Sequence, residues 1–246
     1  MTTALGEFST LEVFRAGHVG WLVFDRPEAG NALDATMFAE LESAWALLDA
    51  DPDVRVVVTT GNGASFQTGL DVRQLARDPA AMREQSRRTK RSELRMTAWH
   101  CGVWKPVIAA VNGMCAGGGL HFVADADIVI VASDAEFCDP HVSIGQVTAY
   151  ETIGLARKVA MEAVMRLALL GRHERVSAYR AHELGVCSQI VDPPSELRAA
   201  AQALGETIAQ HDPEFLAATK RAMWGAFETS RSAAQSAAVF TNGARS

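Results

Sequence analysis

Strand patterns and helical patterns alternate along the first half of the sequence, and this alternation limits the fold more than any other feature. Four runs rich in Val and Ile have the composition of buried strands, at residues 19–24, 54–60, 106–111 and 127–132. Between the first two runs, apolar residues from Leu33 to Leu48 recur at spacings of three and four, which predicts a helix with one apolar stripe. Strands that alternate with helices form βα units with parallel strands, so we predict an α/β core over residues 1–193.

After Asp134 the pattern becomes mainly helical. Helical patterns cover residues 150–170, 177–184, 195–210 and 214–227, and one short strand-like run covers 188–191. The last two helices are amphipathic, so the C-terminal region, residues 194–246, packs on its own core or docks on another subunit. The small and polar residues 233–246 are expected to fray.

Charge and cysteine content exclude several classes of protein. The net charge of −6 argues against a general nucleic-acid binder, and we interpret the basic stretch at residues 83–95 as a solvated helix face. The four cysteines have no C-x-x-C spacing, which is typical of a reducing compartment. Because no targeting segment and no long apolar run is present, we expect a cytoplasmic protein without a membrane span.

Three successive glycines form the most informative local motif. In the segment KPVIAAVNGMCAGGGLHFVADAD, residues 105–127, a strand is predicted to end at Asn112 and a helix to begin around Gly117–Gly119. A helix start presents free backbone N–H groups and favours negative charge, and glycines remove the side chains that would keep a ligand away. The motif predicts a site for an oxyanion or a phosphate.

A second glycine-rich segment, GNGASFQTGLDV at residues 61–72, follows another predicted strand and reaches Gly69 just before Asp71. It offers a second exposed backbone N–H. The segment does not fit the dinucleotide fingerprint, because Phe66 stands where that pattern needs glycine. The sequence also has no phosphate-binding P-loop motif and no G-x-S-x-G, which disfavours nucleotide hydrolysis and α/β-hydrolase chemistry.

Together these and other landmarks make the chain similar to the crotonase (enoyl-CoA hydratase/isomerase) superfamily. They occur in the family's order and span nearly the whole chain: DRP at 25–27, NAL at 31–33, SFQTGLD at 65–71, KPVIAAVNG at 105–113 with the glycine triplet, ADAD at 124–127, SAYRA at 177–181 and LGV at 184–186. The resemblance implies a spiral core of ββα units and a helical C-terminal region that assembles homotrimers, often paired into hexamers.

The resemblance also implies a substrate and a set of binding residues. The substrate would be an acyl-CoA thioester, with coenzyme A as part of the substrate and no separate cofactor. The backbone N–H groups of Leu70 and Gly118 would form an oxyanion hole for the enolate, which can supply a few kcal/mol of transition-state stabilisation. The residues expected near coenzyme A are Gly69, Asp71, Arg73, Gly117 and Lys220.

The chain departs from the hydratase pattern at the two catalytic glutamates of the family. His121 and His141 stand at those positions, 20 residues apart as in the family. Imidazole is neutral or cationic near its ordinary pKa of about 6.5, whereas a carboxylate is an anion, so a paired-carboxylate hydration is in doubt. His121 would lie in the first turn of a helix, where the dipole disfavours a cation, so we expect it to be a neutral base and His141 to shuttle the proton.

Two acids near the histidines have open roles. Glu151 would orient an imidazole, as the third member of a triad does, or would only stabilise a helix start. Asp139 would bond His141 or only shape the turn before Pro140. A metal site built from His121, His141, Asp139 and Cys138 lacks any regular ligand spacing, so no metal is expected.

Three functions therefore remain open. The first is an enzyme of the hydratase/isomerase family that acts through an enolate, with the His pair and Glu151 as its catalytic groups. The second is a hydrolase in which histidine-activated water attacks a β-diketone or a thioester, an arrangement similar to that of 6-oxocamphor hydrolase relatives. The third is a non-catalytic scaffold that retains the coenzyme A site.

Overall fold

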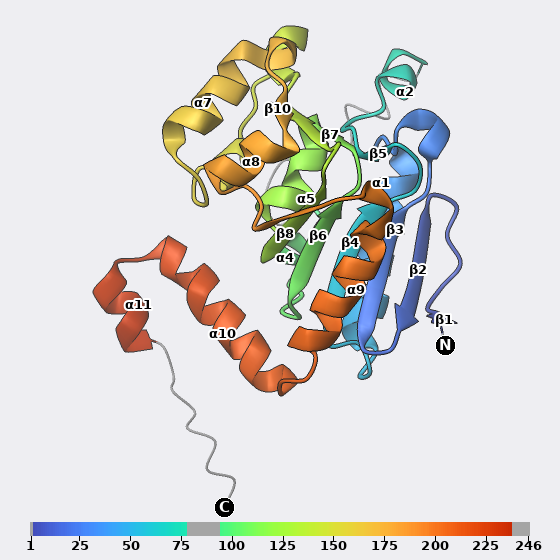
Figure 1. Cartoon of the computed structure of the whole chain (residues 1–246), viewed down its shortest axis with the longest axis vertical. Coiled ribbons are helices and arrows are strands. Elements are labelled where there is room, and N and C mark those ends of the chain that lie inside the picture. Colours follow the sequence, from blue (N-terminus) through green and yellow to red (C-terminus); the bar gives the residue numbers. More distant parts are fainter. Residues whose placement is uncertain (1, 78–93, 238–246) are drawn as a thin grey trace, which may run out of the picture.

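The computed structural model describes residues 2–77 and 94–237, which form two β-sheets with helices around them (Figure 1). Within these residues the larger sheet has seven strands, in the order β1-β2-β3-β4-β6-β8-β11, and the smaller has four, in the order β10-β9-β7-β5. The strands are β1 Thr2–Ala4, β2 Leu11–Ala16, β3 Val19–Phe24, β4 Val56–Gly61, β5 Ser65–Gln67, β6 Val107–Val111, β7 Met114–Ala116, β8 Ile128–Ala132, β9 Glu136–Cys138, β10 Val176–Ser177 and β11 Gln189–Val191.

The helices surround the two sheets and continue into a C-terminal arm. The α-helices are α1 Ala35–Ala50, α2 Val72–Arg77, α4 Ala98–Cys101, α5 Leu120–Ala124, α6 Tyr150–Leu155, α7 Met161–Leu170, α8 Ala178–Leu184, α9 Leu197–Ile208, α10 Pro213–Gly225 and α11 Arg231–Ala237. The short 3-10 helices are η1 Pro27–Ala29, η2 Gly117–Gly119, η3 His141–Ile144, η4 Gly171–His173, η5 Pro194–Glu196 and η6 Ala226–Glu228. None of the helices in this part of the chain is long and apolar enough to cross a membrane.

Three successive strand pairs give the core its spiral. In β4–β5, β6–β7 and β8–β9, the first strand lies in the larger sheet and the second in the smaller sheet. Neighbouring strands from β3 to β11 are parallel, and so are β5, β7 and β9. Strands β3, β4 and β6 are buried along their whole length, which explains their uninterrupted Val-rich and Ile-rich sequences. The predicted α/β core of ββα units is confirmed.

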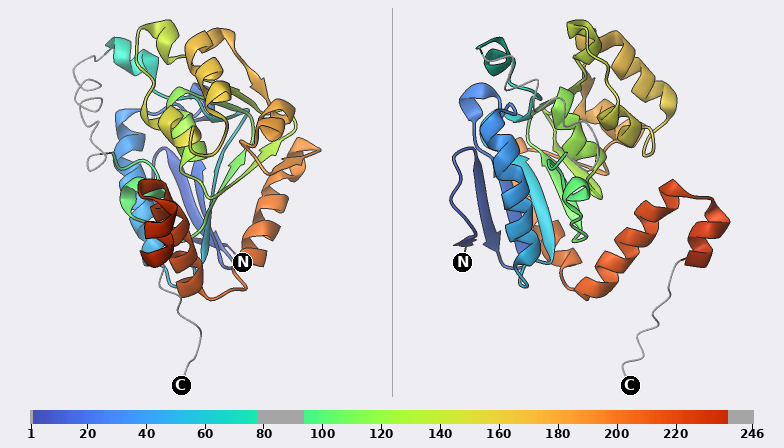
Figure 2. Two further views of the ribbon diagram at one scale, coloured as in Figure 1. Left: turned by 90° about the vertical axis from the view of Figure 1, so that its left-hand side faces the viewer. Right: turned by 180° about the vertical axis from the view of Figure 1, so that it is seen from behind.

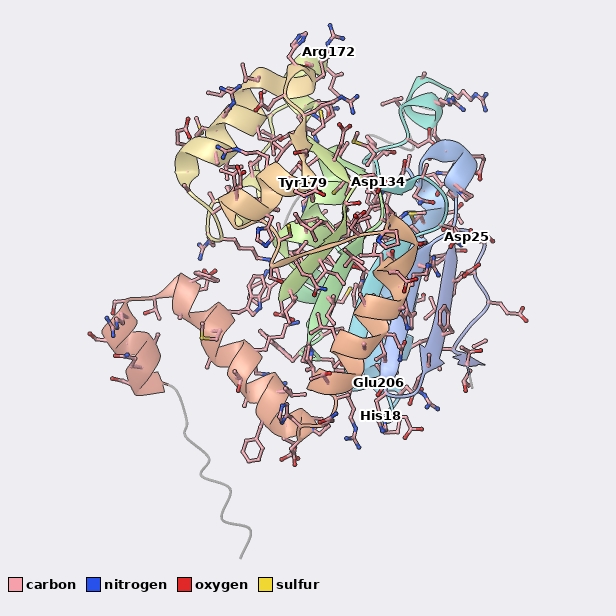
Figure 3. All side chains as sticks on the ribbon, viewed as in Figure 1. His18, Asp25, Asp134, Arg172, Tyr179 and Glu206 are labelled. Carbon is pink, nitrogen blue, oxygen red and sulfur yellow. The ribbon has the colours of Figure 1, made fainter. Side chains whose placement is uncertain are left out.

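Helices α1 and α9 cover opposite faces of the larger sheet (Figures 1 and 2). Asp34 caps α1 by accepting a hydrogen bond from Met37 N at 2.8 Å, and the predicted apolar stripe of this helix is buried. On the other face, Glu206 of α9 accepts from His18 N at 3.2 Å, at the end of the sheet where Figure 3 shows both residues. The site-bearing loops therefore extend from a sheet that is covered on both faces.

The predicted helix over residues 150–170 is wrong as a single element. The structure has α6 and α7 with a turn between them. In that turn Lys158 Nζ donates to the carbonyl oxygens of Val123, at 3.0 Å, and Ala126. This tertiary anchor at the end of α5 turns the chain, and apolar periodicity alone could not indicate it.

The C-terminal arm, α10 and α11, extends away from the two sheets (Figure 2). Helix α10 is attached to the core through Trp224, whose Nε1 donates to Asp127 Oδ1 at 2.6 Å and whose ring stacks on Trp99 at 5.1 Å. Residues 233–237 belong to α11, so the predicted fraying is wrong for them. Residues 238–246 and most of the basic stretch at 83–95 lie outside the described residues.

Candidate active site

Both predicted oxyanion residues and all three predicted catalytic side chains line one cavity of about 440 Å³. The lining includes two sets of groups, the backbone of Leu70 and Gly118 and the ionisable side chains of His121, His141 and Glu151. Apolar and aromatic side chains complete the lining, among them Leu33, Phe38, Met96 and Tyr150. A mostly apolar cavity with a few convergent polar groups has the usual composition of a small-molecule site.

The backbone around Leu70 is held so that its own N–H faces away from Leu33. Leu33 N donates to Gly69 O at 2.7 Å, and Asp71 N donates to Leu33 O at 2.9 Å. In an extended chain the amide groups of successive residues point to opposite sides, so the N–H of Leu70 points away from this bridge. Gln67, fully buried, fixes the preceding residue by accepting from Gly69 N at 2.6 Å.

The glycine triplet is packed against the Leu70 loop. Gly118 lies in the first turn of η2, where backbone N–H groups have no partner inside the helix. A side chain on Gly69, whose φ is +86°, would place its Cβ 2.8 Å from Gly118 N, and one on Gly119 would place it 2.1 Å from Gln67 O. The absence of these Cβ atoms therefore allows the two loops to approach each other.

Among the ionisable side chains, the carboxylate of Glu151 lies between the two histidines. Glu151 Oε2 is 3.5 Å from His121 Nε2, and Glu151 Oε1 is 3.3 Å from His141 Nδ1. His141 Nδ1 also lies 2.6 Å from Oδ1 of the fully buried Asp139. Both acids whose roles the sequence left open thus contact an imidazole, and Glu151 contacts both.

The pKa values of the two histidines are shifted in opposite directions. Burial, together with the nearby His100 and His141, lowers the pKa of His121 to about 3, so this ring is neutral. The hydrogen bond to Asp139 raises the pKa of His141 above its ordinary value, and the charge of Glu151 adds to this effect. Burial raises the pKa of Glu151. A neutral His121 was expected from the helix dipole, but burial and neighbouring imidazoles are the causes found in the structure.

Sequence reasoning missed two residues beside His121. The ring of His100 in α4 lies 5.9 Å from that of His121, and the ring of Tyr150 lies 6.4 Å from it. His100 is 21 positions before His121 and belongs to no motif, so only the fold brings the two together. Tyr150 directly precedes Glu151 in the sequence, and this adjacency could have indicated that Tyr150 also lines the cavity.

The residues expected near coenzyme A do not all gather at this cavity. Gly69 and Gly117 lie beside it, but Asp71 is used structurally: its carboxylate caps α2 and pairs with Arg26 at 3.0 Å. Arg73 is exposed on α2. Lys220 lies elsewhere in this chain, at the amino ends of β6 and β8, where Nζ is 2.8 Å from Asp127 Oδ2. Their roles in binding coenzyme A remain predictions.

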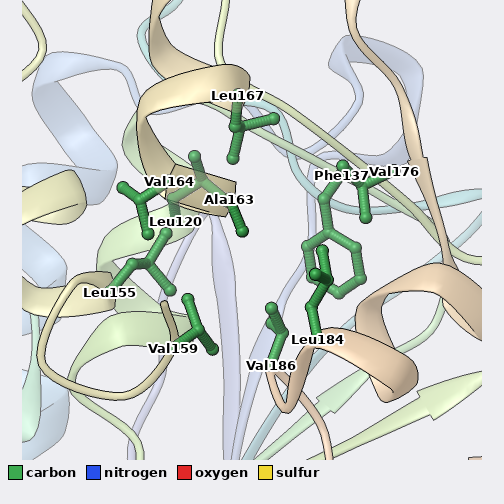
Figure 4. A pocket seen from close by; sticks show the side chains of 10 residues that line it. All are labelled: Leu120, Phe137, Leu155, Val159, Ala163, Val164, Leu167, Val176, Leu184 and Val186. Carbon is green, nitrogen blue, oxygen red and sulfur yellow. The ribbon is translucent and has the colours of Figure 1, made fainter. Parts of the chain in front are cut away.

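Other places in the described residues offer less chemistry. No group of three or more His, Cys, Asp or Glu side chains in this part of the chain is arranged to hold a metal ion. Behind α5 and α6 lies a second cavity of about 30 Å³, with ten aliphatic or aromatic side chains around it (Figure 4). Leu120 of α5 and Leu155 of α6 belong to its apolar lining, which contains no ionisable side chain.

Comparisons with known proteins show the family of the chain. The family model of enoyl-CoA hydratase/isomerase matches residues 15–242. The (E)-benzylidenesuccinyl-CoA hydratase of Thauera aromatica is 36% identical over 87% of this chain and 80% of its own. The peroxisomal delta(3,5)-delta(2,4)-dienoyl-CoA isomerase of Arabidopsis thaliana is 32% identical over 91% of this chain and 84% of its own.

A solved structure extends the likeness to the fold. The enoyl-CoA hydratase/isomerase from Mycobacterium paratuberculosis superposes with a TM-score of 0.83 at 33% identity, covering 94% of this chain and 88% of that one. Sequence and fold agree over nearly the whole length. The chain belongs to the enoyl-CoA hydratase/isomerase family, within the crotonase superfamily.

Proposed function

We propose that the protein acts on an acyl-CoA thioester through an enolate, with the N–H groups of Leu70 and Gly118 as oxyanion hole and the histidines as proton-transfer groups. The observation that carries the proposal is the shared cavity, which is lined both by the two backbone donors and by a carboxylate within 3.5 Å of two imidazoles. Relatives named as a benzylidenesuccinyl-CoA hydratase and a dienoyl-CoA isomerase support coenzyme A thioesters as the substrate class.

The proposed chemistry needs one base and one acid. A neutral imidazole takes a proton from water while the water oxygen bonds to the β-carbon of an enoyl thioester. The π electrons move onto the thioester oxygen, where Leu70 and Gly118 stabilise the negative charge. The imidazolium then returns a proton to the α-carbon. An isomerase would use the same groups to move a proton between two carbons of the acyl chain.

The tautomer of His141 favours its Nε2 as the nitrogen that exchanges protons. The carboxylate of Asp139 accepts from Nδ1–H at 2.6 Å, which leaves Nε2 for substrate or water. His121 remains the neutral partner because it is buried. Glu151 balances the positive charge that forms on either ring.

The same Asp139–His141 pair supports a second candidate, a hydrolase of β-diketones or thioesters. An imidazole oriented by a carboxylate is the usual arrangement for activating water that attacks a carbonyl carbon. Such a reaction would break a carbon–carbon or carbon–sulfur bond and release an acid. Leu70 and Gly118 would stabilise the oxyanion in this case too.

We also propose that the C-terminal region, residues 194–246, takes part in a homotrimer or hexamer. Helix α10 and the following η6 expose Phe215, Met223 and Phe227, although α10 extends away from the sheets of its own chain. Large exposed apolar side chains favour burial against another subunit. Light scattering of the full chain should give a mass of three or six times 26.4 kDa.

A substrate panel with histidine variants tests the function. We expect wild-type protein to convert an enoyl-CoA thioester, and His141→Ala to lower kcat by about 10²- to 10⁴-fold, the usual contribution of acid–base catalysis. His182→Ala, at an exposed position on α8, is the matched control and should keep full activity. Full activity in both His121→Ala and His141→Ala would contradict the assigned roles.

A second assay separates the remaining functions. Linear and cyclic 1,3-diketones are incubated with the wild type, and mass spectrometry is used to look for the cleaved acid. Formation of that acid, without turnover of enoyl-CoA, would favour the hydrolase. Calorimetric binding of coenzyme A without turnover of any substrate would favour a non-catalytic protein.

A further inference from the structure

His100 is a buried ionisable side chain beside the cavity that the proposed reaction does not use. Only 6% of its side chain is exposed, and its ring plane is inclined by 63° to that of His121. It comes from α4, whereas His121, His141 and Glu151 of the cavity come from α5, η3 and α6. Buried polar groups are held by specific partners, so these partners define what the ring can do.

Thr97 and Asp125 fix the ring of His100. Thr97 Oγ1 donates to Asp125 Oδ2 at 2.6 Å and lies 3.0 Å from His100 Nδ1. A hydroxyl group has a single proton, so once Thr97 has donated to Asp125 its oxygen accepts from His100. Nδ1 of His100 therefore carries a proton, whether the ring is neutral or cationic. Asp125 Oδ2 also lies 3.9 Å from His100 Nε2.

The same short helix connects the two imidazoles. Helix α5 carries His121, and Asp125 is its C-cap, with Asp125 N donating to His121 O at 2.9 Å. A displacement of His100 would thus act on His121 directly, through the ring contact, and indirectly, through the end of α5. This double connection distinguishes His100 from the other side chains that touch His121.

Several ionisable groups lie near His121 and His100, and Lys220 as well as Lys158 acts on Asp125. Glu151 of α6 and His141 of η3, with Asp139 behind it, face His121 opposite to His100. Asp125 faces His100, and Lys158, on the turn before α7, lies near Asp125. Arg95 contacts the backbone of His100 by donating to its carbonyl oxygen at 3.2 Å.

We propose that His100 is a positioning residue for His121, held by Thr97 and Asp125 so that its ring orients the His121 imidazole and keeps it neutral. Two imidazolium rings at this separation repel each other, and burial strengthens the repulsion. The site then holds its proton on His141, beside Asp139, and keeps His121 available as a base. This inference rests on the proposed function, because it assigns a purpose to the neutral state of His121.

The first test follows the protonation of His121 directly and needs no substrate. Imidazole nitrogen chemical shifts are recorded in the full chain labelled with ¹⁵N-histidine, from pH 8 downward. In His100→Asn, the side-chain amide can still donate to Thr97, but the ionisable ring is gone. We expect the pKa of His121 to rise by about one unit, a tenfold gain in proton affinity.

Two comparisons make this test decisive. His182→Asn, the control on α8, should leave the titration of His121 unchanged. His100→Phe keeps an aromatic ring against His121 without a charge and should give the same upward shift, which also covers the case that His100→Asn does not fold. An unchanged titration of His121 in a folded His100 variant would overturn the proposal.

The second test uses turnover. The acidic limb of kcat/KM against pH, where His121 becomes protonated, should move to higher pH in His100→Asn, whereas a structural defect would lower kcat/KM equally at all pH values. If the nuclear magnetic resonance shift is found but no thioester is converted, the proposed function fails and the positioning role stands. If turnover is found and the limb does not move, the positioning role fails alone.

Discussion

The cavity is lined by two backbone donors and by three ionisable side chains, and these two sets of groups are held in place by different contacts. The backbone set, Leu70 and Gly118, is fixed by backbone hydrogen bonds and by the close approach of two glycine loops. The ionisable set, His121, His141 and Glu151, is held by contacts between Glu151 and the two imidazoles and by the hydrogen bond from His141 to Asp139. Where the sequence departs from the hydratase pattern at catalytic side chains, it does so in the ionisable set.

This comparison indicates which substitutions each set of groups tolerates. Backbone donors do not depend on side-chain identity, so only a change in packing or chain conformation can move them. Proton-transfer groups respond to any neighbouring charge, because a single nearby charge changes a pKa by about one to three units. We therefore expect charge substitutions to change proton transfer by the ionisable set while the positions of the two backbone donors stay the same.

The largest effect is expected for Glu151→Gln. The variant keeps the size of the side chain and removes the negative charge between the two histidines, so kcat should fall by about 10²- to 10⁴-fold with little change in KM. Glu162→Gln, an exposed acid in the first turn of α7, is the matched control. A loss of less than about tenfold would reduce Glu151 to an acid that only stabilises the start of α6.

A smaller but distinct effect on kcat is expected for Gly69→Ala, next to the backbone donors. Its Cβ would lie 2.8 Å from Gly118 N and would separate the two donors. We expect kcat to fall by about 10²- to 10³-fold, as when an oxyanion donor is lost. The pH profile should keep its shape because no charge changes.

Gly185→Ala controls for the backbone conformation of Gly69. Gly185 has a φ of +82°, close to the +86° of Gly69, but a Cβ at Gly185 would meet no atom within 4 Å. In denaturant titration, Gly185→Ala should lose about 1 kcal/mol of unfolding free energy from the left-handed conformation, and Gly69→Ala should lose more because its Cβ also meets backbone atoms. Equal activity of the two variants would show that the glycine contact is not needed for catalysis.

The smallest effect on catalytic rate is expected for Asp139→Asn, which should change the pKa of His141 more than it changes kcat. Asp139 favours the cationic form of His141, so its neutralisation lowers the pKa of His141. The limb of kcat/KM that follows deprotonation of His141 should then move to lower pH, by about one unit. Glu136→Gln, which removes an exposed acid that pairs with Arg175, should leave the limb in place.

The same variant has a stability signature with a defined sign. In the folded protein the pKa of Asp139 is lowered and that of His141 is raised, so their pairing stabilises the fold where Asp139 is charged and His141 is protonated. This stabilisation is lost as the pH rises through the folded pKa of His141. The destabilisation by Asp139→Asn should therefore be larger at pH 6 than at pH 9; a constant difference would contradict the pairing.

Much of the core could be predicted from the sequence because its main strands are mostly apolar runs of five or six residues. The runs that became β3, β4, β6 and β8 have a clear pattern in the sequence. The smaller sheet could not be predicted, since its strands have two or three residues and show no periodicity. The turn between α6 and α7 depends on Lys158 reaching carbonyl groups more than thirty positions earlier.

Residues of the site that lie in sequence motifs could be predicted, whereas a residue that is a neighbour only in space could not. The sequence placed Leu70, Gly118 and both histidines because each lies in a phrase with fixed spacing, and the structure brings all four to one cavity. It did not indicate His100, whose contact with His121 exists only after α4 and α5 have packed. The sequence also could not show whether Asp139 or Glu151 contacts a histidine. In the structure both contact His141.

The position of Glu151 between two imidazoles makes His121, His141 and Glu151 a single titrating unit. Groups coupled this closely shift one another's titration midpoints, so a limb of the activity profile assigned to His121 or His141 also depends on the other two groups. The pH optimum can therefore be reset by substitution at any of the three. The backbone N–H groups of Leu70 and Gly118, which do not titrate, stay unchanged.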